Sequence, residues 1–86
     1  IPRDFARMAL AKEVQAQALT TPMEVVLYLE RRFFEVPLQP RDREEMAAFL
    51  AEALGTTDVA AAQSYAEEPL RRLLHAMLSR PEYQLG

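Results

Sequence analysis

The most apolar stretch of the chain runs from Thr20 to Phe34, TTPMEVVLYLERRFF, and its apolar positions lie on nearly every face of a helix. A helix of this kind must be covered by several neighbours. Thr21 can cap its first turn, Glu24 can reach back to the cap amide, and Pro22 stands where a missing N–H costs nothing. The pattern predicts a central helix over residues 22–34, which the prolines that follow it bring to an end.

Two later segments each carry a single apolar stripe, with apolar residues three and four positions apart as in an α-helix. The stripe of residues 40–54 consists of Met46, Phe49, Leu50, Ala53 and Leu54, and Gly55 follows where a left-handed C-cap residue is favoured. The stripe of residues 69–79 consists of Leu70, Leu73, Leu74, Met77 and Leu78. We expect both helices to pack on the central one, with Glu67–Arg71 and Glu68–Arg72 as solvated ion pairs worth about 0.3 kcal/mol each.

The remaining segments have weaker patterns. Residues 2–19 predict a first helix with a thin apolar face. Residues 59–66, after a turn and cap at residues 56–58, predict a helix of one or two turns. Pro69 is expected to divide that short helix from the last one, because a proline inside a helix removes a hydrogen bond and clashes with the preceding turn; a kink is the alternative to a break. In the linker after the central helix, Val36 and Leu38 are expected to lie against the core.

These elements predict an all-α fold, a small bundle of four to five helices around the central helix 22–34, with a single helical domain over residues 1–86. The composition agrees, because there are only two glycines and residues of high helix propensity are abundant. The net charge of −3 provides no basic field for phosphate backbones, so no nucleic-acid partner is expected. No run approaches the roughly 20 apolar residues that span a bilayer.

The chain has no cysteine, which removes disulfides and cysteine metal ligands and leaves the compartment unspecified. It begins at Ile1 rather than methionine, which suggests a processed product or a piece of a longer protein.

His75, the only histidine, points away from the leucine stripe of the last predicted helix. With Ser79 it formally resembles a base and a nucleophile. No acid in this segment orients the imidazole, however, and no glycine-rich elbow surrounds the serine. The acids within residues 42–45 and 67–68 lie at predicted helix N-termini, where the helix dipole favours them. We therefore predict no catalytic residue, no metal ligand and no cofactor.

Two basic doublets and the aromatic residues near the first of them form the candidate partner surface. If the doublets lie close together in the fold, they offer a site for an anion or a partner protein; ordinary solvated helix faces are the simpler explanation. The aromatic residues have the core as their alternative place. The candidate surface consists of Arg31, Arg32, Phe33, Phe34, Arg71, Arg72 and Tyr83.

The second half of the chain, from VVLYLERRFFEVPLQPRDREEMAAFL to EEPLRRLLHAMLSRPEYQLG, resembles the helical C-terminal parts of large uncharacterised bacterial proteins, many of them exported and abundant in planctomycete-like genomes. Residues 38–40, LQP, match the linker of those proteins. Residues 73–83 match their ending, a leucine helix followed by Ser-Pro-Glu-aromatic, although Arg80 separates the serine from the proline. The helical linker domains of phycobilisomes are a second resemblance, without their basic character. The first resemblance implies a C-terminal helical module of a longer protein, and neither supplies catalytic residues.

These observations favour a non-enzymatic helical module with an interaction or structural role in a larger bacterial protein. Its partner would be the rest of the parent protein, another protein or a second copy of the chain. The alternative is a helical bundle that binds a small molecule or an acyl chain in a cavity lined by methionine and phenylalanine.

Overall fold

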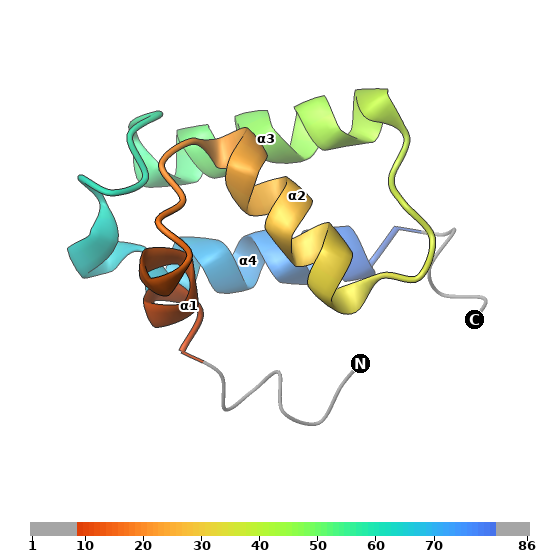
Figure 1. Cartoon of the computed structure of the whole chain (residues 1–86). Coiled ribbons are helices and arrows are strands. Elements are labelled where there is room, and N and C mark those ends of the chain that lie inside the picture. The colour runs from red at the N-terminus through yellow and green to blue at the C-terminus, as the bar shows by residue number, and fades with distance from the viewer. Residues whose placement is uncertain (1–8, 81–86) are drawn as a thin grey trace.

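The computed structural model describes residues 9–80, which form four α-helices, one short 3-10 helix and no strand. The elements in order are α1 (Leu10–Ala16), α2 (Pro22–Phe33), α3 (Pro40–Leu54), η2 (Gln63–Tyr65) and α4 (Glu67–Leu78). α3 and α4 run in opposite directions, α2 crosses them obliquely, and α1 lies beside the start of α4 (Figure 1). The predicted all-α bundle is confirmed.

The start of α2 has the predicted capping box. The Thr21 hydroxyl accepts a hydrogen bond from the Glu24 N–H at 3.2 Å, and the Glu24 carboxylate accepts the N–H groups of Thr20 and Thr21 at 2.8 and 3.1 Å. These backbone hydrogen bonds, that from Thr20 first, lower the pKa of Glu24 below its ordinary value. Pro22 occupies the first helical position. The Glu24 N–H, an orphan donor of this helix end, and the N–H groups of Thr20 and Thr21 therefore find their partners within five residues of chain.

The buried core draws on every element except η2. Its residues are Leu10, Val14, Val25, Val26, Leu29, Leu38, Met46, Leu50, Leu54, Val59, Ala62, Ala66, Leu70, Leu73, Leu74 and Met77. α2 packs mainly on α3, whereas α4 packs on α1, α3 and η2. Met23, Leu27 and Tyr28 of α2 are only half-buried. The expectation that neighbours cover nearly every apolar face of this helix was therefore too strong.

Two helix limits differ from the prediction. α4 begins at Glu67 rather than at Pro69, because a proline in the first turn gives up no helical hydrogen bond. α1 ends at Ala16 rather than at residue 19, and Ala18 then adopts a left-handed conformation with φ 56°. The N-terminal part of the predicted first helix lies outside the described residues.

Left-handed residues follow both α1 and α3. After α1, the N–H groups of Ala18 and Leu19 donate to the carbonyls of Gln15 and Val14 at 3.0 and 3.2 Å. This pattern is that of a Schellman motif. After α3, the predicted cap residue Gly55 has φ 76°, and the next N–H donates to the carbonyl of Ala51 at 3.2 Å. The same backbone turn is thus made once with alanine and once with glycine.

Two apolar side chains, Val36 and Phe49, are more exposed than their patterns predict. Val36 is 63% exposed, although Leu38 is buried as expected. Phe49 is 37% exposed, so the buried stripe of α3 runs only through every fourth residue, Met46, Leu50 and Leu54. The segment between α3 and α4 forms turns and η2 instead of a regular α-helix, and its Tyr65 is 53% exposed.

Candidate functional site

The C-terminal end of α2 and the bend that follows it carry most of the predicted partner residues. We call residues 31–36 the α2-end surface. Arg31 and Arg32 are exposed, Phe33 and Phe34 are half-buried against the core, and Val36 is largely exposed. Five apolar or cationic side chains therefore meet the solvent within six consecutive residues.

Local backbone chemistry places these side chains. Phe34 ends the helix in an extended conformation, with φ −119° and ψ 135°, while its N–H still donates to the Glu30 carbonyl at 2.9 Å. Val36 precedes Pro37, which excludes the helical conformation at Val36. The chain bends at residues 35–36 and then buries Leu38. Val36 is thus held outward by a bend whose far side is anchored in the core.

An ion pair fixes this end of α2 to α3. The Arg43 guanidinium makes two hydrogen bonds with the Glu30 carboxylate, Nε to Oε2 and Nη2 to Oε1, both at 2.8 Å. Glu30 is a buried residue, and the hydrogen bonds from Arg43 hold the pKa of its carboxyl below the ordinary value, although burial acts in the opposite direction. Two parallel bonds of this kind restrict both the distance and the rotation between the helices.

A second polar cluster joins α2 to α1. The Tyr28 hydroxyl donates to the Glu13 carboxylate at 2.7 Å, and the Arg32 guanidinium lies 3.2 Å from the same carboxylate. Burial, followed by the hydrogen bond with Glu13, raises the pKa of Tyr28. The Arg32 guanidinium also lies 5.5 Å from the centre of the Phe33 ring, within the range of a cation–π interaction. The Arg32 guanidinium therefore already has intramolecular partners, although its side chain is exposed.

A shallow hollow of about 360 Å³ lies beside this cluster, lined by Gln17, Tyr28, Arg31 and Arg32. Arg32 is paired with Glu13, and Arg31, the other cation of the doublet, is exposed.

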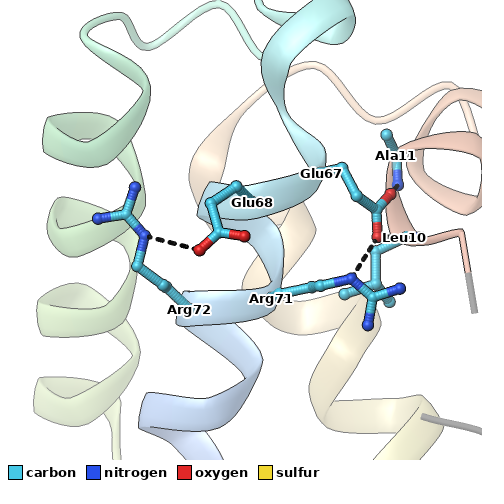
Figure 2. A network of polar contacts seen from close by, with 6 residues as sticks. All are labelled: Leu10, Ala11, Glu67, Glu68, Arg71 and Arg72. Atoms are coloured by element: carbon cyan, nitrogen blue, oxygen red, sulfur yellow. Dashed lines mark hydrogen bonds and ion pairs between the residues drawn. The ribbon is translucent and has the colours of Figure 1, made fainter. Parts of the chain in front are cut away.

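The second basic doublet does not form a single basic surface. Figure 2 shows Arg71 on the α1 side of α4, paired with Glu67 at 2.9 Å, and Arg72 on the α3 side, paired with Glu68 at 3.9 Å. The Glu68–Arg72 pair is well exposed, as predicted. Each guanidinium of this doublet thus has its own glutamate one turn away.

The predicted Glu67–Arg71 ion pair forms, but it is only partly solvated, with 39% and 30% of the two side chains exposed. The Glu67 carboxylate also accepts the N–H groups of Leu10 and Ala11 at 3.2 and 2.9 Å (Figure 2). Ala9, at the N-cap position, makes no side-chain cap bond, so a carboxylate from α4 completes the N-terminus of α1. The two partners are 57 residues apart, and no local pattern reports such a contact.

Two of the acids at the start of α3 form ion pairs with a residue far along the chain. Arg80 forms an ion pair with the buried Asp42 and lies 3.6 Å from the carboxylate of Glu45. Sequence reasoning assigned these acids to the helix dipole alone and missed Arg80, because nothing in the sequence shows that the end of α4 returns to the start of α3. Tyr83, the last residue of the candidate surface, lies outside the described residues.

His75 is exposed, and the Ser79 hydroxyl donates to the backbone carbonyl of His75 at 2.7 Å rather than to its imidazole. Among residues 9–80, no group of three or more histidine, cysteine or acidic side chains could hold a metal ion. Within the same part of the chain, no helix has the length and apolarity needed to cross a membrane.

Two further pockets, of about 260 and 410 Å³, open on the surface. The first is lined by Gln15, Ala18, Leu19, Thr20, Ala60 and Gln63, and the second by Gln39, Pro40, Arg41 and Asp42. Neither these two nor the hollow beside Tyr28 is lined by methionine or phenylalanine, so none of the three supports the alternative of a lipophilic binding cavity.

Comparison of the chain with protein-family models, with curated proteins and with solved structures finds no match. The function therefore has to be argued from the geometry of the chain itself.

Proposed function

We propose that the chain is a non-enzymatic helical module of a larger bacterial protein, and that it binds a protein surface through the α2-end surface. The observation that carries this proposal is the exposure of Val36, 63% of which faces the solvent beside two half-buried phenylalanines. Covering the Val36 side chain removes apolar surface from water, which favours binding. Because Leu38 anchors the bend, little conformational entropy is lost when the partner binds.

The residue types of this surface fit a protein partner. Aromatic residues and arginine are enriched in interface cores and among the residues that contribute most to binding. Arg31 supplies an exposed planar cation next to the apolar side chains. The partner surface that complements this arrangement is apolar at its centre and carries a carboxylate at its edge.

A photo-crosslinking experiment tests the proposal. The full chain with benzoylphenylalanine in place of Val36 is irradiated in a lysate of the cells that produce it. We expect a crosslink to one defined protein, or to a second copy of the chain, that is lost when Arg31→Glu is added. The matched control carries the same probe in place of Ala48, an exposed position in the middle of α3. Equal crosslinking from both positions, or none from position 36, would refute the proposed surface.

A further inference from the structure

The short helix α1 depends for its structure on the surface it packs against. It has seven residues, and isolated helices shorter than about 12–15 residues are marginal in water. Leu10 and Val14 are fully buried, and α1 packs on α4. The α1 seat, which we define as α4 together with η2, therefore provides the apolar surface that α1 lacks on its own.

The α1 seat also recognises the backbone of α1. Glu67 accepts the N–H groups of Leu10 and Ala11, and the Gln63 side-chain amide donates to the carbonyl of Ala11 at 2.8 Å. These three hydrogen bonds join groups 52 to 57 residues apart in sequence. None of them involves the connection between α1 and α2, so an α1 helix supplied by another copy of the chain would make the same bonds.

The connection itself favours such an exchange. It consists of residues 17–21, and Ala18 within it holds φ 56°. A left-handed conformation costs an L-residue about 1–2 kcal/mol relative to its ordinary conformations. When the connection extends to reach a neighbouring molecule, the turn gives up the hydrogen bonds from the N–H groups of Ala18 and Leu19. Ala18 is released from this conformation, and every contact of α1 with its seat is kept.

We propose that two copies of this chain exchange their α1 helices, so that α1 of each copy occupies the α1 seat of the other. Domain swapping of this kind reuses the contacts of the monomer and requires no new surface. The partner is a second copy of the chain, and the contact lies at α1 and α4 rather than at the α2-end surface. The inference is therefore independent of the proposed function.

Crosslinking between two single-cysteine variants tests the exchange. The chain has no cysteine, so Ala11→Cys and Gln63→Cys each introduce one thiol at a contact between α1 and its seat. The two full-length variants are mixed, incubated at high concentration and treated with a short bis-maleimide. A crosslinked heterodimer is expected, because residues 11 and 63 of different copies meet only across the exchanged helix. Adding Ala18→Gly to both variants should reduce the yield by about fivefold, since it relieves the monomer of the strain.

Two controls decide the interpretation. Ala48→Cys replaces Ala11→Cys in a matched mixture, because Ala48 is exposed on α3, outside the contact. A heterodimer yield as high with this variant would overturn the proposal. Sedimentation velocity of the unmodified chain over a hundredfold range of concentration gives a second measurement that needs no substitution. A monomer at every concentration would overturn it as well, whatever the crosslinking shows.

Discussion

The left-handed residues after α1 and α3 allow a pair of substitutions that should change the free energy of unfolding in opposite directions. Ala18 follows α1 with φ 56°, and Gly55 follows α3 with φ 76°. Alanine is strained in this conformation because of its Cβ, whereas glycine adopts it readily. We expect Ala18→Gly to raise the free energy of unfolding and Gly55→Ala to lower it.

The magnitude follows from two opposing contributions. The left-handed conformation costs alanine about 1–2 kcal/mol, and glycine loses about 0.5–1 kcal/mol more backbone entropy on folding. The difference is about 1 kcal/mol in each direction. No packing effect disturbs this value, because a Cβ added at Gly55 meets no atom within 4 Å and the methyl group of Ala18 is exposed.

Thermal unfolding followed by circular dichroism measures both changes. For a domain of this size, about 1 kcal/mol shifts Tm by roughly 4–8 °C. We expect a higher Tm for Ala18→Gly, a lower Tm for Gly55→Ala, and a double variant near the starting protein. A Tm lowered by several degrees in Ala18→Gly would show that residue 18 does not hold the left-handed conformation.

Three further substitutions test individual contacts. Thr21→Ala removes the cap acceptor of α2 and should cost about 1 kcal/mol in chemical denaturation. Arg43→Gln leaves the buried Glu30 carboxylate without its cation and should cost about 3 kcal/mol near neutral pH. Because the pKa of Glu30 is lowered in the folded state, its stabilising contribution is present above the unfolded pKa and is lost as the pH falls through the folded pKa. The acid-side loss of stability should therefore be smaller in Arg43→Gln. Tyr28→Phe removes the hydrogen bond to Glu13 and should cost about 1 kcal/mol.

Matched exposed positions serve as controls. Thr57→Ala changes an exposed threonine in the turn after α3, and Arg41→Gln changes an exposed arginine in the first turn of that helix. Each should leave stability within about 0.5 kcal/mol of the starting protein. A Thr57→Ala effect equal to that of Thr21→Ala would argue against a capping role. An unchanged acid-side slope in Arg43→Gln would show that Glu30 does not titrate through this pair.

Local signals in the sequence were sufficient for most of α2, α3 and α4, but not for the segment between α3 and α4 or for how the helices are joined. The capping box at Thr21, the leucines of α4 and the glycine after α3 each act within a few residues, and all three are present as predicted. Whether an apolar residue is covered depends instead on elements distant in the chain. This is why Val36 was expected to be buried and Glu67 to be solvated.

In the candidate site too, local features could be predicted from the sequence, whereas most contacts between distant residues could not. The α2-end residues were identified by their types and adjacency, and their placement at the end of α2 follows from the prolines. The acids that pair with Arg32 and Arg71 lie on α1 and α4, and only the first of these pairs joins different helices. The sequence predicted the Glu67–Arg71 and Glu68–Arg72 pairs but not the pairing of Arg32 with Glu13, and in the structure three of the four arginines have a glutamate partner.

The hydrogen bonds from the start of α1 to the Glu67 carboxylate can form only after α4 has begun to be synthesised. α1 is the first described helix to leave the ribosome, but the acid that caps it is 57 residues behind Leu10. At roughly 5–20 residues per second, about 3–11 seconds pass between the synthesis of Leu10 and that of Glu67. Until α4 is synthesised, Leu10 and Val14 of α1 lack the surface that buries them in the finished fold.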